Sequence, residues 1–292
     1  MRKKIPNILL VFILYSASTF SQVRVEIQDP WITGIDKLPP RTAIWPSPDA
    51  ESAEQESYEN AAWVRSLNGS WSFKWSPDPK SRPVDFYRKE FDRKAWPQIP
   101  VPSTIERQGY GVPLYVNSTY PFKANPPRVM DEPDSDFTSY MQRNPVGSYI
   151  RTFRVPENWS DKQITLHFAG ISAAAFVWVN GHKAGYSQGS RLPAEFDITR
   201  YLVEGENQLA VEVYKYCDGS YLEDQDFWRL SGIYRDVFLR AVPKTTLWDI
   251  YARPDVELVN NKGKISMHYS SANFTGNSKK KLVLEVSVLS PA

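Results

Sequence analysis

The sequence has 292 residues with 35 basic and 33 acidic side chains, and its net charge of +2 gives no indication of a nucleic-acid partner. A single cysteine, Cys217, excludes an intrachain disulfide, and three histidines leave little material for a histidine-rich metal site or a Ser-His-Asp triad. Aromatic residues make up 14% of the chain and prolines number 23, which favours β-structure with long loops over helix bundles.

The first 21 residues have the pattern of a signal peptide. Three cations at the start precede the apolar run Ile5–Tyr15, and small residues follow before Gln22. The apolar run is too short to span a bilayer. Removal of the signal leaves 32 basic residues against 33 acidic ones. We therefore predict an exported protein, periplasmic or extracellular, with no membrane span and a nearly neutral mature chain.

The mature chain is predicted to begin with an extended segment and to continue as many short strands. Residues 22–57 are rich in proline and should run over the surface. Strands are expected from Leu67 onward, where apolar and polar residues alternate. The clearest are Trp71–Trp75, Tyr149–Val155, Ile164–Phe168, Leu209–Val213 and Gly232–Val242.

Turn signals between these strands indicate an antiparallel fold. Asn180-Gly181 joins two short apolar runs, and this pair is the strongest short-range signal of a hairpin. The stretch Tyr110–Pro145 holds six prolines and is predicted to be a long loop, which is usually functional. Residues 58–243 are therefore predicted to form an all-β jelly-roll β-sandwich.

A second unit is expected after a boundary near Pro243. Within residues 244–292, strands are predicted at Ile250–Val256, Lys264–Tyr269 and Leu282–Leu289. An immunoglobulin-like sandwich needs about seven strands. We therefore predict a partial immunoglobulin-like domain, as in a fragment of a longer protein or a truncated gene.

The stretch Gly219–Asp236 carries the most distinctive chemistry. It interleaves aromatic and large apolar side chains, among them Trp228, with the acids Glu223, Asp224 and Asp226. Buried unpaired carboxylates would be too costly for a plain core strand. A sugar site needs flat rings for the C–H faces of the sugar and carboxylates for its hydroxyls. An irregular loop held in place by aromatics is the plainer alternative.

Three motifs together resemble the N-terminal sugar-binding domain of family 2 β-galactosidases, the large bacterial lactose-cleaving type. The resemblance spans about Asp29 to Val242. β-Glucuronidases and β-mannosidases share the jelly-roll framework, but their chains do not usually read Glu-Asp-Gln-Asp-Phe-Trp. The motifs are Tyr115–Pro121 with Asn125–Pro127, Gly185–Asp197 with Gly205–Asn207, and Gly219–Asp236.

This resemblance implies a role for two residues in binding β-galactoside. Asn117 matches the position that reaches into the active site and hydrogen-bonds the galactose. Asp226 matches the aspartate that binds a galactose hydroxyl and a sodium ion (Na+). Plainer alternatives are a turn residue for Asn117, and for Asp226 a salt bridge to Arg229 or Arg235.

The resemblance also implies a structural magnesium ion (Mg2+) between the N-terminal segment and this domain. Gln188 and Asp218 match two of the family's ligands. Glu26 and Asp29 could supply further oxygens, although Glu26-Ile-Gln-Asp-Pro30 departs from the family's Asp-Trp-Glu-Asn-Pro. The plainer alternative for Asp218 is a turn residue before Gly219.

The catalytic pair of a retaining glycosidase is not expected in this sequence. Such enzymes need two carboxyls about 5 Å apart, and the family carries both as glutamates on a TIM barrel. No barrel fits here, and the Asn-Glu dipeptide of the acid/base residue is absent. We therefore expect the N-terminal portion of a β-galactosidase that acts with retention and is a homo-oligomer at full length, with the 292 residues alone inactive. The alternatives are a stand-alone non-catalytic carbohydrate-binding module, and a family 2 enzyme for mannose or glucuronate.

Overall fold

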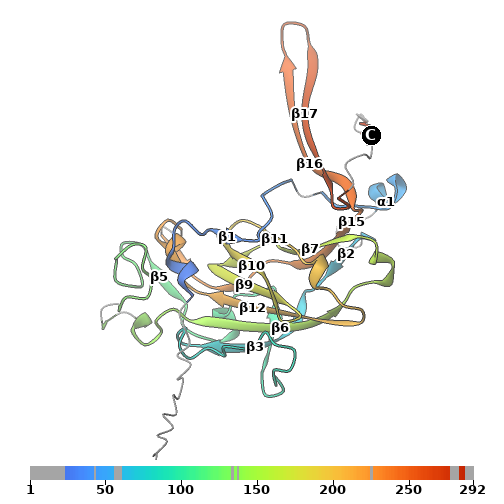
Figure 1. Ribbon diagram of the computed structural model, residues 1–292. Helices are drawn as coiled ribbons and strands as arrows, with labels where there is room; N and C mark the ends of the chain where they lie inside the picture. The colour runs from blue at the N-terminus through green and yellow to red at the C-terminus, as the bar shows by residue number, and fades with distance from the viewer. Residues whose placement is uncertain are drawn as a thin grey trace, which may run out of the picture.

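The protein folds as an all-β structure built on two facing sheets (Figure 1). The computed structural model describes residues 24–42, 44–55, 61–132, 135–136, 138–223, 226–276 and 283–286. Every strand pair among these residues is antiparallel. The predicted β-sandwich is confirmed. The predicted signal peptide, residues 1–21, lies outside the described residues.

The larger sheet has seven strands, and β12 lies at its centre. β12 pairs with β6 on one side and with β9 on the other, so both of its edges are hydrogen-bonded. In spatial order the strands are β1 (Gly34–Ile35), β10 (His182–Gln188), β9 (Ala174–Val179), β12 (Glu206–Tyr214), β6 (Val146–Arg154), β3 (Gly69–Ser76) and β4 (Gln98–Val101).

The smaller sheet has four strands and packs against one face of the larger one. The main core lies between them, where Val177 and Val211 of the larger sheet belong to the same buried cluster as Leu166 and Leu239 of the smaller. Along β12 the cluster takes every second residue, Leu209, Val211 and Val213, which is the alternation that the sequence predicted. In spatial order the strands are β11 (Ala194–Asp197), β7 (Gln163–Phe168), β15 (Val237–Val242) and β2 (Val64–Ser66).

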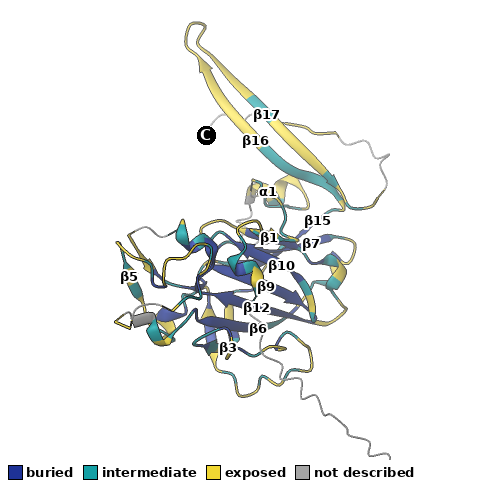
Figure 2. Ribbon diagram, turned by 60° about the vertical axis from the view of Figure 1, so that its left-hand side comes forward, coloured by how far each residue is buried: buried dark blue, intermediate teal, exposed yellow. Residues whose placement is uncertain are grey.

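The other face of the larger sheet is also covered. A second buried cluster joins Phe176 and Tyr214 of this sheet to Phe86, from the segment between β3 and β4, and to Ile27 from the N-terminal segment. The middle strands are therefore buried on both faces and dark blue in Figure 2. This covering explains why residues 146–150 of β6 are all buried, in place of the alternation expected for Tyr149–Val155.

The Asn180-Gly181 hairpin is confirmed. The two residues join β9 to β10 with φ values of 52° and 85°, which is the left-handed backbone that this turn requires. The single strand predicted at Gly232–Val242 was wrong. It is divided into β14 (Gly232–Ile233), which pairs with β8 (Ile171–Ser172), and β15, which pairs with β7 and β2, and residues 234–236 between them are not in a strand.

Helices are few and short among the described residues. No helix in the described part of the chain is both long and apolar enough to cross a membrane. The α-helix is α1 (Ala50–Gln55), and the 3-10 helices are η1 (Val25–Gln28), η2 (Glu106–Gln108), η3 (Thr138–Met141), η4 (Glu157–Trp159), η5 (Thr199–Tyr201) and η6 (Asp218–Tyr221).

A long hairpin follows the sandwich. β15 ends at Val242, and β16 (Thr245–Glu257) then pairs with β17 (Lys262–Asn273) in a two-stranded ribbon that projects from the sandwich (Figure 1). The third strand expected at Leu282–Leu289 falls mostly outside the described residues, and 283–286 form no strand. The partial immunoglobulin-like domain stays a prediction.

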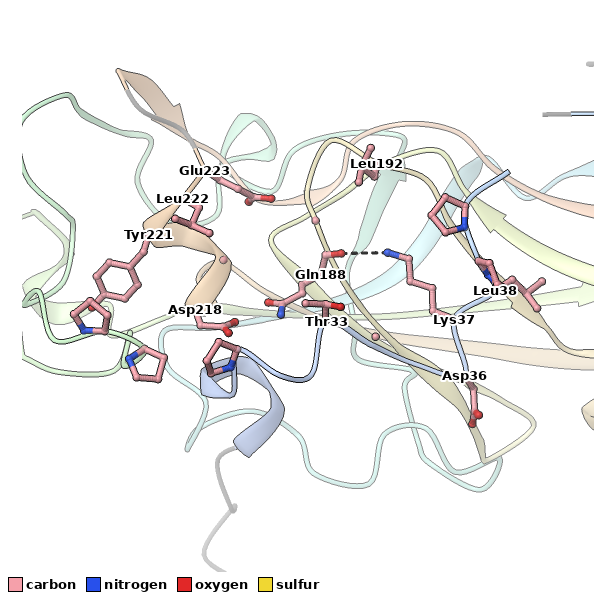
Figure 3. A pocket seen from close by; sticks show the side chains of 18 residues that line it. Thr33, Asp36, Lys37, Leu38, Gln188, Leu192, Asp218, Tyr221, Leu222 and Glu223 are labelled. Atoms are coloured by element: carbon pink, nitrogen blue, oxygen red, sulfur yellow. Dashed lines mark hydrogen bonds between the residues drawn. The ribbon is translucent and has the colours of Figure 1, made fainter. Parts of the chain in front are cut away.

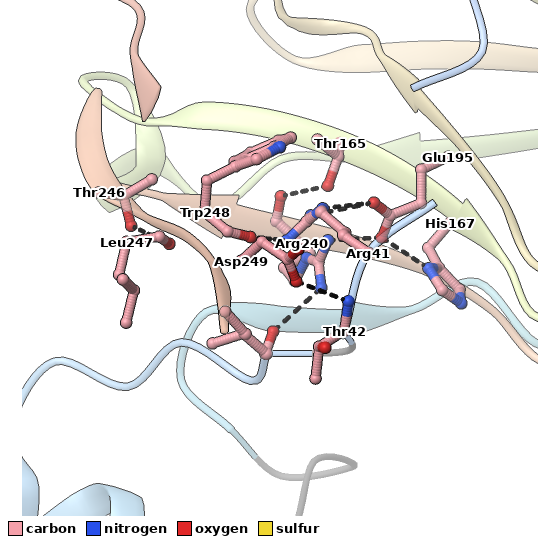
Figure 4. Close-up of polar contacts among 11 residues, drawn as sticks. Arg41, Thr42, Thr165, His167, Glu195, Arg240, Thr246, Leu247, Trp248 and Asp249 are labelled. Carbon is pink, nitrogen blue, oxygen red and sulfur yellow. Dashed lines mark hydrogen bonds and ion pairs between the residues drawn. The ribbon is translucent and has the colours of Figure 1, made fainter. Parts of the chain in front are cut away.

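A buried polar cluster fixes the root of this hairpin to the sandwich (Figure 4). The carboxylate of Glu195 on β11 accepts hydrogen bonds from Arg41 and from Arg240, and it contacts His167 Nδ1 at 2.8 Å. The Arg41 guanidinium lies 3.9 Å from the ring centroid of Trp248 on β16 and donates to the Trp248 carbonyl. Arg41 of the N-terminal segment thus links β11 of the sandwich to β16 of the hairpin through one side chain.

Candidate functional site

A short ribbon brings the two predicted sugar-binding residues together. β5 (Leu114–Val116) pairs with β13 (Phe227–Arg229), and Val116 is opposite Phe227. Asn117 directly follows β5 and Asp226 directly precedes β13, so the two are the next opposed positions along the ribbon. Asn117 and Asp226, which are far apart in the sequence, are therefore brought together by the register of this strand pair.

Asp226 is exposed and has an unusual backbone. Its φ of 53° lies in the left-handed region, which aspartate adopts more readily than most residues. Its Oδ1 accepts a hydrogen bond from the Tyr115 hydroxyl. This bond to the carboxylate raises the pKa of the Tyr115 phenol above its ordinary value. The carboxylate is thus held at the surface by a neighbouring strand.

Both residues line one hollow of about 400 Å³ at the end of the ribbon. An amide can both donate to and accept from a sugar hydroxyl, and a carboxylate can bridge a hydroxyl and a hard cation. Tyr120 and Tyr221 supply aromatic rings to the lining, and on the ribbon itself the ring centroids of Tyr115 and Trp228 lie 5.6 Å apart. The remaining lining residues are Val116, Ser118, Thr119, Leu222, Glu223 and Arg229.

The arginines considered as alternative partners of Asp226 have other contacts in the structure. Arg229 is buried and donates to the carbonyls of Ser220 and Glu223 at 3.4 and 3.2 Å. Arg235 donates to the Arg191 carbonyl at 3.3 Å. The observed partner of Asp226, Tyr115, was missed in the sequence analysis, although Tyr115 lies two residues before Asn117, a spacing that puts both side chains on one face of an extended chain.

Glu223 joins two of the sequence motifs. It follows η6 rather than lying on a strand, and its two carboxylate oxygens accept from the backbone N–H and the hydroxyl of Ser190 at 2.8 and 2.5 Å. Ser190 belongs to the Gly185–Asp197 motif. Glu223 therefore holds two loops together beside the hollow. Asp224 lies outside the described residues.

Two of the predicted magnesium ligands lie side by side at the edge of a larger groove of about 910 Å³ (Figure 3). Gln188 ends β10 and Asp218 begins η6. Gln188 Oε1 and Asp218 Oδ1 are both buried acceptors without a hydrogen-bond donor. Burial raises the pKa of the Asp218 carboxyl, because the charged form loses its hydration. Two adjacent buried oxygens without donors fit a hard cation.

The N-terminal side of this region is only partly arranged for a metal. Asp29 is close enough to Asp218 for its charge to contribute to raising the pKa of that carboxyl. Glu26 is paired with Lys183 at 3.1 Å. The described residues contain no group of three or more His, Cys, Asp or Glu side chains arranged for a metal. Any magnesium here would therefore depend on amide and carbonyl oxygens as well.

Known proteins of one family are similar to this chain over most of its length. Residues 64–243 match the family model described as the sugar binding domain of glycosyl hydrolases family 2. The beta-galactosidase of Priestia megaterium is 39% identical over 258 residues, which are 88% of this chain and 24% of that protein. That of Halalkalibacterium halodurans is 45% identical over 212 residues, 71% of this chain and 20% of that protein. The chain thus spans about a quarter or less of these two relatives.

Similar solved structures share the fold. A beta-glucuronidase from an uncultured Clostridium sp. is 25% identical, with a TM-score of 0.54 over 74% of this chain and 34% of that one. A calcium-binding mutant of Bacteroides uniformis beta-glucuronidase 2 is 24% identical, with a TM-score of 0.53 over 72% of this chain and 22% of that one. With the family model covering more than half of the sequence, the chain belongs to glycosyl hydrolase family 2 and contains its sugar-binding domain.

Proposed function

We propose that this chain supplies part of the galactose site of a β-galactosidase, which hydrolyses terminal β-galactosides with retention. The observation that carries the proposal is the meeting of Asn117 and Asp226 in one hollow at the end of the β5–β13 ribbon. The relatives named beta-galactosidase, at 39 to 45% identity, support galactose as the glycone. The structural neighbours named beta-glucuronidase support the fold rather than the sugar.

In this proposal the chain binds and orients the sugar but does not cleave it. The Asn117 amide exchanges hydrogen bonds with ring hydroxyls, and Asp226 accepts from another hydroxyl. A bound sodium ion would supply a positive charge that keeps sugar oxygens and the Asp226 carboxylate together. The acid/base and nucleophile carboxyls, about 5 Å apart in a retaining enzyme, come from a barrel outside these residues. Gln188, Asp218 and Asp29 would hold a structural magnesium ion.

The 292 residues alone are expected to bind galactose weakly and to leave nitrophenyl β-galactoside intact. A hydrogen bond that replaces one to water gains only about 1 kcal/mol. Two or three such bonds fall short of the roughly 4 kcal/mol that millimolar affinity requires. Calorimetry that finds micromolar galactose binding would instead favour a stand-alone carbohydrate-binding module.

The proposal is tested on the complete product of the gene that encodes this sequence. It should hydrolyse nitrophenyl β-galactoside much faster than the matching glucuronide or mannoside. Asp226→Asn should raise the KM and weaken activation by sodium, because it removes the charge that holds the ion. Asp85→Asn, an exposed aspartate between β3 and β4, is the control and should change neither. An Asp226→Asn enzyme with an unchanged response to sodium would contradict the assignment.

The proposed location is outside the cytoplasm, as the basic and apolar start of the chain indicates. N-terminal sequencing of the secreted protein should give a mature start close to Gln22. Retention of the first 21 residues on a cytoplasmic protein would refute this part of the proposal.

A further inference from the structure

The hydrogen bond between Tyr115 and Asp226 has no role in the proposed binding of galactose and sodium by Asn117 and Asp226. Tyr115 is the middle residue of β5, directly opposite Trp228. Because side chains alternate along a strand, Tyr115 and Asn117 point to the same face of the ribbon. Asp226 precedes β13 in left-handed backbone, and its carboxylate reaches Tyr115, whose hydroxyl donates to Asp226 Oδ1. The phenol therefore contacts the Asp226 carboxylate from the strand that leads to Asn117.

An exposed carboxylate needs such a contact to keep one orientation. Asp226 sits in a tight left-handed turn at the surface, where its side chain would otherwise rotate freely in water. The Tyr115 hydroxyl occupies one carboxylate oxygen and leaves the other for ligands. The Asn117 side chain also interacts with this hydroxyl, and it acts on the pKa of the phenol in the opposite direction to Asp226. One hydroxyl thus links the amide to the carboxylate.

We propose that Tyr115 is a positioning residue, whose hydroxyl holds the Asp226 carboxylate and the Asn117 amide in one arrangement before sugar and cation bind. This inference rests on the proposed function. Its physical basis is preorganisation: a carboxylate already oriented loses less freedom when it binds an ion. The aromatic ring of Tyr115 packs against Trp228, so a phenylalanine at this position keeps the packing and removes only the hydroxyl.

The main experiment compares Tyr115→Phe with a matched control in the complete enzyme. Tyr87→Phe is the control, because its hydroxyl also donates to an exposed aspartate, Asp85, at 3.3 Å, but in the segment between β3 and β4. We expect Tyr115→Phe to raise the sodium concentration for half-maximal activity about three- to tenfold, the effect of losing one hydrogen bond. At saturating sodium its kcat should return to within about twofold of the wild type. Tyr87→Phe should leave the sodium midpoint unchanged.

A second readout is independent of catalysis and uses the 292-residue chain. The Cζ resonance of Tyr115, assigned by its loss in Tyr115→Phe, reports the titration of the phenol. Asp226→Asn should lower the pKa of this phenol, because the carboxylate that raises it is gone. An unchanged phenol titration in Asp226→Asn would overturn the inference, and so would an unchanged sodium midpoint in Tyr115→Phe.

These outcomes separate the inference from the function on which it rests. A wild-type enzyme that hydrolyses galactosides without any response to sodium would refute the sodium role of Asp226. The KM for galactoside in Tyr115→Phe would then decide the role of Tyr115, together with the phenol titration. A threefold or larger rise in KM with a kcat near that of the wild type would support positioning of the sugar ligands, and an unchanged KM would overturn it.

Discussion

Replacing Glu195 by glutamine should destabilise the fold more than any surface substitution of the same kind. The Glu195 side chain is 10% exposed, and its charged partners Arg41 and Arg240 are 6% and 1% exposed. Glutamine keeps the shape but removes the negative charge, which leaves two arginines facing each other in the interior. Removing one partner of a buried ion pair costs about 3–5 kcal/mol, a large share of the roughly 5–15 kcal/mol that stabilises a domain.

Urea unfolding followed by tryptophan fluorescence measures this loss. The midpoint should fall in Glu195→Gln while the slope with urea stays the same. Glu157→Gln is the control, because Glu157 is exposed on η4 and should change the free energy of unfolding by less than about 0.5 kcal/mol. Arg41→Met should have a smaller effect than Glu195→Gln, since Glu195 keeps Arg240 and His167. A Glu195→Gln protein within about 1 kcal/mol of the wild type would refute this description of the cluster.

Two further predictions concern buried positions. A Cβ on Gly185 would lie 2.4 Å from the carbonyl oxygen of Ile35 and 2.6 Å from the ring of Phe196. Gly185→Ala should therefore lower the midpoint of thermal unfolding by several degrees. Gly263→Ala in the exposed hairpin is the control, because a Cβ there meets nothing within 4 Å and should leave the midpoint unchanged. Burial raises the pKa of the Cys217 thiol to about 12, so Ellman's reagent should not react at pH 8 until urea unfolds the chain. The unfolded chain releases this proton near pH 8.5 and the folded chain near pH 12, so between these values stability should fall more steeply with pH in the wild type than in Cys217→Ala. Rapid labelling of the folded protein, or equal slopes, would contradict the second prediction.

The sandwich could be predicted from the sequence because its turns and strands have local sequence patterns. Asn180-Gly181 requires left-handed backbone, and Leu209, Val211 and Val213 alternate as a half-buried strand does. The burial of β6 on both faces of the sheet could not be predicted from such local patterns. It depends on Phe86 and Ile27, which come from segments without strand periodicity and reach the sheet only in the folded chain.

The candidate site was predictable through its motifs rather than through periodicity. Asn117 and Asp226 were found because the residues around them resemble a known family, and the register of β5 with β13 explains why they meet. The Glu195 cluster was missed because its members are spread from Arg41 to Arg240 as isolated charges. Nothing in their spacing distinguishes a buried ion network from solvated side chains.

Because the seven-stranded sheet is buried on both faces, its strands and the exposed hairpin should unfold in different ways. Amide hydrogens of β12 are bonded on both edges of the strand and shielded on both faces, so they should exchange with solvent deuterium only when the whole domain unfolds. Those of β16 and β17, in a largely exposed two-stranded ribbon, should exchange through local fraying. β12 leads within a few residues through Cys217 into η6 and then β13. The loop that carries Asp226 therefore begins at the slowest-exchanging part of the chain.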